Sequence, residues 1–101
     1  MIHVIATVQV KPGMASKFLD ILKANVPLVE AEKGCIRYVP TVDAEADLPP
    51  QVMDANQVTI IETWDGLENL RAHLVSPHMI AYREKVSGIV ENVTIKVLRE
   101  A

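Results

Sequence analysis

The segment that most restricts the fold is residues 2–10, IHVIATVQV, which is rich in Ile and Val and ends at the turn sequence Lys11-Pro12-Gly13. This composition predicts a β-strand. Apolar residues occupy both alternating sets of positions, as in strands whose sheet is covered on both faces. A chain of 101 residues forms one domain and buries only about 60–65% of its unfolded surface. We therefore expect a second copy of the chain to cover one face of the sheet.

Periodic patterns predict most of the remaining secondary structure. In residues 14–32 apolar side chains recur at three- and four-residue steps, which indicates an amphipathic helix. Pro27 lies inside this pattern and is expected to kink the helix or hold it open near residue 23. Gly34 is expected to end it. Three further strands are predicted, at 35–42, 57–64 and 89–98.

Between the last two of these strands the sequence predicts two helices. Asp65 and Glu68 have the spacing of a capping box. Ser76 and Pro77 place a favoured N-cap before a favoured first helical residue, which starts a second helix that runs to about Ser87. The order β-α-β-β-α-β, with its second α divided, is that of a ferredoxin-like α+β fold with a four-stranded antiparallel sheet and helices on one face.

Charge and hydropathy exclude several function classes. The chain has 10 Lys and Arg against 13 Asp and Glu, a net charge of −3, without the basic patch that nucleic-acid binding needs. Its apolar runs are far shorter than the roughly 20 residues that span a bilayer. The N-terminus has no signal-peptide pattern. We therefore expect a cytoplasmic protein with neither a nucleic-acid nor a membrane partner.

Motifs for metals and cofactors are missing. The single cysteine, Cys35, can form neither an intrachain disulfide nor a cysteine-based metal cluster. His73 and His78 are five positions apart across the expected helix break, not the four that pair two ligands on one helix face, and no HExxH accompanies them. There is no GxGxxG, phosphate loop or GxSxG either. We expect no metal and no nicotinamide or nucleotide cofactor.

The end of the third predicted strand carries an acid and a large aromatic ring on one face. Glu62 and Trp64 share that face because side chains alternate along a strand. A buried acid needs a partner, so Glu62 either forms an ion pair with Arg71 or Arg83 or serves in catalysis and substrate binding. Trp64 either fills the core or forms a flat wall for an aromatic ligand.

Two histidines are candidate general bases. His73 precedes the helix break, and His78 lies in the first turn of the next helix, where the positive end of the helix dipole favours a neutral ring. A neutral imidazole can accept a proton from a phenol. The alternative is that each histidine only packs or caps a helix. Three further residues are candidates for substrate binding: Asn25, which falls on the apolar stripe of the first helix, Tyr38, and Tyr82, which shares the helix face of His78.

Four motifs together resemble the antibiotic biosynthesis monooxygenase (ABM) domain, over about residues 2–98. They are the Lys11-Pro12-Gly13 turn, the strand start Gly34-Cys35-Ile36-Arg37-Tyr38, the pair Glu62-x-Trp64, and His73-Leu74-x-Ser76-Pro77-His78. The resemblance implies a ferredoxin-like monomer whose sheet packs on that of a second copy, forming a homodimeric α+β barrel. Family members include quinol monooxygenases that work without metal, flavin or haem.

Two departures from the family pattern matter. The haem-degrading branch uses an Asn, a Trp and a His at positions that hold Ala6, His73 and Tyr82 here, which argues against haem cleavage. Residues 43–56, DAEADLPPQVMDAN, are longer than in the shortest members and predict an extended acidic arm. In a dimer this arm is expected either to reach over the partner's pocket or to extend the interface.

The leading functional hypothesis is a monooxygenase for a quinol or polyphenol, in which His73 or His78 deprotonates the ring and the phenolate passes an electron to O2. Trp64 and Tyr38 would be walls, and Asn25 and Tyr82 hydrogen-bonding groups. One alternative is an isomerase or lyase for a small oxygenated or phosphorylated metabolite, of the type that degrades phosphorylated autoinducer-2; an arginine in the pocket would favour it. A non-catalytic dimeric ligand-binding module is the other alternative, and histidines directed away from any cavity would favour it.

Overall fold

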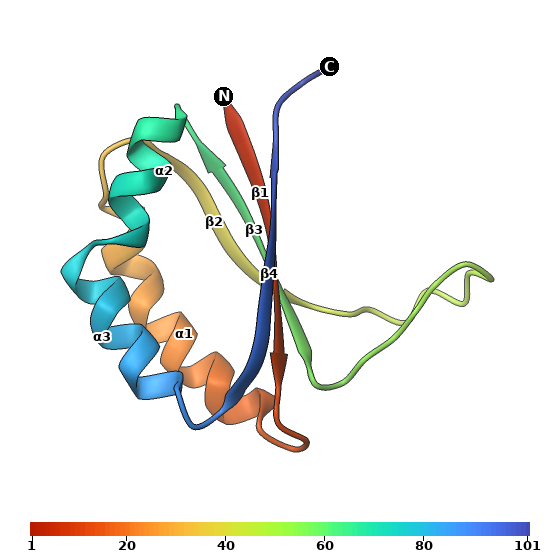
Figure 1. The fold of residues 1–101 in the computed structure, drawn as a ribbon. Helices are drawn as coiled ribbons and strands as arrows, with labels where there is room; N and C mark the ends of the chain where they lie inside the picture. The colour runs from red at the N-terminus through yellow and green to blue at the C-terminus, as the bar shows by residue number, and fades with distance from the viewer.

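The computed structural model describes all residues, 1–101, as one four-stranded sheet with three helices packed on the same face (Figure 1). Its elements, in chain order, are β1 (Ile2–Val10), α1 (Ala15–Glu30), β2 (Cys35–Val42), β3 (Gln57–Trp64), α2 (Leu67–Leu74), α3 (Pro77–Val86) and β4 (Val90–Leu98). This confirms the predicted ferredoxin-like order, including the division of the second helical region. No helix combines the length and the apolar character needed to cross a membrane.

The strands pair in the order β2-β3-β1-β4, and every pairing is antiparallel. The Ile- and Val-rich β1 is therefore an inner strand, as its apolar composition requires. Strand β2 lies at an edge, where Pro40 can be accommodated because no second neighbour needs its missing N–H. Residues 43–56 contain neither helix nor strand and extend away from the sheet, as predicted (Figure 1).

One face of the sheet forms the core together with the helices. Alternate residues of β1 are buried on this face, and Phe18, Leu22 and Val29 of α1 pack against them without any exposed surface. The helices do not extend over β4, so Val93, Ile95 and Val97 are about half exposed on the same face. The sheet is therefore left open along one side, and a mostly apolar cavity forms there.

Some details of the helix ends differ from the sequence predictions. Helix α1 ends at Glu30, before residue 32, and it continues through Pro27. Gly34 has a φ of +80°, and a Cβ at this position would clash with the side chains of Asp65 and Asn69. Gly34 is thus required where the chain enters β2, rather than as the end of the helix.

The predicted capping box at the start of α2 is wrong. The N-cap is Gly66, and the carboxylate of Asp65 instead accepts a hydrogen bond from the amide of Asn69. The prediction for α3 is confirmed, because Ser76 is its N-cap and Pro77 its first residue. The hydroxyl of Ser76, however, donates to the carbonyl of His73, 2.8 Å away, and so stabilises the break between the two helices.

Candidate active site

A cavity of about 380 Å³ lies between the helices and the open part of the sheet. Most of its lining is apolar and comes from β1, β3, α3 and β4. Its polar and ionisable lining residues are Tyr38, Glu62, His73, Tyr82, Arg83 and Ser87. An apolar cavity with a few polar groups is the usual form of a small-molecule site.

Four of the seven predicted site residues line this cavity: Tyr38, Glu62, His73 and Tyr82. Asn25 and His78 instead line a separate cavity of about 110 Å³ between α1 and α3, together with Tyr82. Trp64 lines neither cavity and has no exposed surface. The two candidate bases therefore occupy different environments, which the sequence alone did not distinguish.

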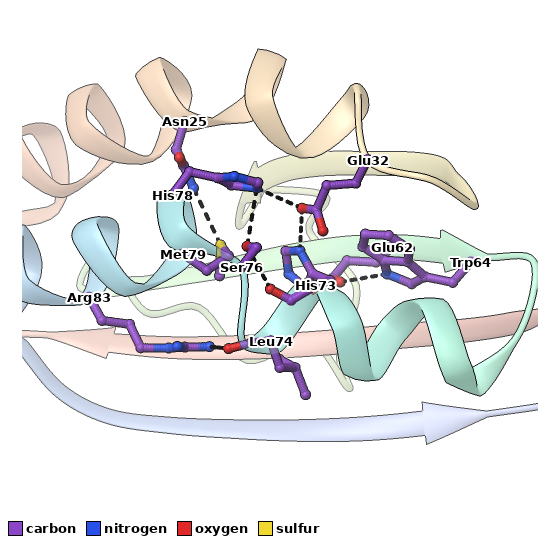
Figure 2. Close-up of polar contacts among 10 residues, drawn as sticks. All are labelled: Asn25, Glu32, Glu62, Trp64, His73, Leu74, Ser76, His78, Met79 and Arg83. Atoms are coloured by element: carbon purple, nitrogen blue, oxygen red, sulfur yellow. Dashed lines mark hydrogen bonds and ion pairs between the residues drawn. The ribbon is translucent and has the colours of Figure 1, made fainter.

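His73, at the C-terminal end of α2, is only 2% exposed and is enclosed by the rings of Trp64 and Tyr38. Its Nδ1 lies 2.7 Å from Oε2 of Glu32 (Figure 2). Burial lowers the pKa of His73 and outweighs the opposing effect of the Glu32 carboxylate. A neutral ring that donates from Nδ1 has its lone pair on Nε2. That nitrogen has no hydrogen-bond partner in the chain and is available on the cavity side.

Glu32 is the important residue that sequence reasoning missed. It lies in the turn after α1, where an acid is typical of a solvated surface, so no local pattern identifies it. In the structure its Oε2 is hydrogen-bonded to both histidines, at 2.7 Å from His73 Nδ1 and 2.8 Å from His78 Nε2 (Figure 2). The Ser76 hydroxyl lies 3.2 Å from the same nitrogen of His78. Glu32 thus fixes the orientation of His73 in the way that a carboxylate orients a catalytic imidazole.

Glu62 is 5% exposed, and its partner is Trp64, whose indole N–H donates to Oε1 at 2.9 Å (Figure 2). The expected alternative of an ion pair with Arg71 or Arg83 is therefore wrong; the guanidinium of Arg83 donates to the carbonyl of Leu74. Burial raises the pKa of Glu62 to about 7, although the Trp64 N–H acts in the opposite direction. A large fraction of this carboxyl is protonated near neutral pH and can donate a hydrogen bond into the cavity.

The two tyrosines supply hydroxyl groups that stay protonated. Burial raises the pKa of Tyr82 to about 12 and raises the pKa of Tyr38 well above its ordinary value, with the carboxylate of Glu62 adding to the shift of Tyr38. Asn25 is buried, and its amide donates to Sδ of Met79 at 3.3 Å rather than toward the main cavity. It contributes to the packing of α1 on α3 and to the smaller cavity.

The site also contains one group of potential metal ligands. Oε2 of Glu32, Nδ1 of His73 and Nε2 of His78 all lie within 4.8 Å of one another. The five-residue spacing of the histidines did not predict this. The break at Ser76 turns α3 relative to α2, so that both rings reach the same carboxylate from different helices (Figure 2).

Comparisons with known proteins identify the family and the fold. Residues 1–85 match the family model described as antibiotic biosynthesis monooxygenase. The chain belongs to this family. A curated relative from Escherichia coli K12, named "Probable quinol monooxygenase YgiN", is 39% identical over 98% of this chain and 97% of its own length.

Solved structures show the same fold. PA3566 from Pseudomonas aeruginosa is 26% identical, with a TM-score of 0.83 over 99% of this chain and 93% of that one. Rv0793 from Mycobacterium tuberculosis is also 26% identical, with a TM-score of 0.81 over 99% and 94% of the two chains. The ABM family and its fold are thus established for this chain, and a monooxygenase-type function follows from the family.

Proposed function

We propose that this ABM protein oxidises a quinol or polyphenol with O2 and needs no cofactor. The observation that carries the proposal is His73, a neutral imidazole that is held by Glu32 and lines an apolar cavity. The name of the Escherichia coli relative, "Probable quinol monooxygenase YgiN", supports the same substrate class.

The proposed chemistry begins when Nε2 of His73 accepts the proton of a ring hydroxyl. The phenolate passes one electron to O2, and the resulting radical pair joins through a new carbon–oxygen bond to give a ring hydroperoxide. The O–O bond then breaks: one oxygen stays on the ring and the other leaves as water, so that quinol and O2 become hydroxyquinone and water. The substrate supplies all the electrons, and the protein positions the ring and excludes water.

Two groups are placed to assist the later steps. Protonated Glu62 can donate a hydrogen bond to the second ring oxygen or to the departing oxygen. Tyr82 and Tyr38 can hydrogen-bond to the ring substituents. Trp64 does not line the cavity. Its indole N–H orients Glu62, and its ring packs on the ring of His73.

Oxygen uptake tests this proposal. With a panel of benzoquinols, naphthoquinols and polyphenols in chelator-treated buffer, we expect consumption of one O2 per quinol, above the rate without protein. Quinol dimethyl ethers are the matched controls, because they have the ring but no proton to remove, and they should not react. Background uptake with every quinol, or loss of uptake on chelation, would contradict the proposal.

One observation favours the isomerase or lyase alternative. Arg83 lines the cavity and provides a cation for a phosphate or carboxylate, although its guanidinium is held by the Leu74 carbonyl. An isomerase or lyase would turn over a phosphorylated hydroxyketone without O2, so anaerobic incubation separates the two functions. The condition for a non-catalytic binding module, histidines away from any cavity, is not met by His73.

We further propose that the chain is a homodimer. The sheet face opposite the helices has no cover within the chain and carries Ile5, Ile61 and Val39 side by side in register. The arm at 43–56, which exposes Leu48 and Val52, remains a candidate for reaching over the partner's pocket or extending the interface.

Replacing Ile61 with Asp is expected to convert the dimer to a monomer at micromolar concentration, because a charge would be buried at the centre of the sheet interface. Light scattering measures the mass. Ile80→Asp is the matched control: Ile80 is 50% exposed on α3, on the helix layer, so this variant should remain dimeric. A monomeric wild-type protein would refute the proposal.

A further inference from the structure

Three side chains bring potential metal-ligand atoms close together (Figure 2). Nδ1 of His73 and Nε2 of His78 lie 2.7 and 2.8 Å from the same oxygen, Oε2 of Glu32. Two imidazole nitrogens and one carboxylate oxygen are a donor set that Zn²⁺ and related divalent ions prefer. The three residues come from the turn after α1, the end of α2 and the start of α3.

The hydrogen bonds within the chain leave one oxygen of the Glu32 carboxylate without a partner. Both rings converge on Oε2, whereas Oε1 of Glu32 accepts no hydrogen bond from the chain. The only ion-pair partners of the carboxylate are the two imidazoles, and no Lys or Arg reaches it. A carboxylate that is mostly shielded from water has much to gain from a cation bound beside it, between the two imidazole nitrogens.

A metal ion fits after a rearrangement of the three side chains. Zinc lies about 2.0–2.2 Å from N and O ligands, so tetrahedral ligand atoms are roughly 3.3 Å apart. The two N–O distances, now 2.7 and 2.8 Å, lengthen by about half an ångström, and the two histidine nitrogens, which lie within 4.8 Å of each other, take up a separation of roughly 3.3 Å. The side chains of Glu32 and His78 are 13% and 20% exposed, so the site can be reached from solvent. The Ser76 hydroxyl donates to the backbone carbonyl of His73 and lies 3.2 Å from Nε2 of His78, which connects the two histidines across the helix break.

We propose that Glu32, His73 and His78 bind a divalent transition-metal ion such as Zn²⁺, with water at the remaining coordination position. The site is unrelated to oxygen activation, and we infer that its occupation is inhibitory. Metal on Nδ1 of His73 moves the ring hydrogen to Nε2, the nitrogen on the cavity side, without changing the number of protons on the ring. The base then has no lone pair for the quinol. This inhibitory consequence rests on the proposed function; the binding site does not.

Metal titration of the full chain tests the site directly. After chelator treatment, we expect one Co²⁺ per chain at neutral pH, with the visible absorption of a four-coordinate ion, and its displacement by one Zn²⁺ in calorimetry. Glu32→Gln and His78→Gln keep the size of each side chain and should weaken binding at least about tenfold. Two matched controls, His3→Gln and Cys35→Ser, remove a histidine and the only thiol outside the cluster and should bind like wild type.

Several outcomes would overturn the assignment. The assignment is wrong if the folded wild-type protein does not bind the metal ion saturably. It is also wrong if both Glu32→Gln and His78→Gln keep the wild-type metal affinity, or if Cys35→Ser loses metal binding. A separate arm measures quinol oxidation as Zn²⁺ is added. Full activity at one bound Zn²⁺ would refute the inhibitory consequence, while failure of every quinol to react would refute the proposed function and leave the titration to decide the site.

Discussion

Replacement of His73 with Asn is expected to lower kcat for quinol oxidation by about 10²–10⁴-fold, the usual contribution of a positioned general base. Asn can still donate to Glu32, but it has no basic nitrogen to direct into the cavity. Oxygen uptake under saturating quinol measures the effect. In His73→Gly, which leaves the space between the rings of Trp64 and Tyr38 empty, added imidazole is expected to restore part of the rate, which a merely structural role would not allow.

Two variants provide the controls for this prediction. His3→Gln alters a histidine outside the site and should keep wild-type activity. His78→Gln should have a smaller effect than His73→Asn, because His78 holds Glu32 but does not line the main cavity. If a folded His73→Asn protein retained most of its activity while His78→Gln lost it, the base would have to be assigned to His78.

The second large effect concerns the dependence of activity on pH. In the proposed mechanism the protonated carboxyl of Glu62 is the hydrogen-bond donor, and burial raises its pKa to about 7. The donor is therefore present below pH 7 and lost as the pH rises through that value, when a carboxylate replaces it beside the phenolate. We expect kcat/KM to fall above about pH 7 and to approach a tenfold decrease per pH unit.

Glu62→Gln isolates this carboxyl. The amide can still accept the Trp64 N–H through its oxygen, and its NH₂ group donates at every pH. The variant is therefore expected to keep substantial activity at neutral pH and to lose the alkaline decrease. Rates are compared after subtraction of the oxidation that occurs without protein at each pH. An unchanged alkaline limb in Glu62→Gln would assign the ionisation to another group.

Much of the fold could be predicted from local patterns. Strand composition placed β1, β2 and β3 correctly, and the Ser76-Pro77 pair located the start of α3. These predictions succeed because the period of apolar residues and the preferences of Pro and Ser depend on neighbouring residues alone. The failed predictions, a cap at Asp65 and a helix end at Gly34, concern residues whose roles depend on each other across the fold.

The site could be predicted only in part for the same reason. Glu62 and Trp64 are two residues apart on one strand, so their shared face follows from the alternation of side chains. Glu32 is separated from His73 by 41 positions and from His78 by 46, and nothing near it indicates that its turn will meet the break between α2 and α3.

The sequence by itself determined the order of strands and helices, the family, and the residues that could carry acid–base chemistry. Only the tertiary structure decided how these residues are combined. It placed His73 at the main cavity and His78 at the smaller one, and it hydrogen-bonded both to Glu32. It also buried Glu62, which raises the pKa of that carboxyl to about 7. The physical reason is that periodicity is a local property, whereas burial and the convergence of distant side chains depend on how the helices pack on the sheet.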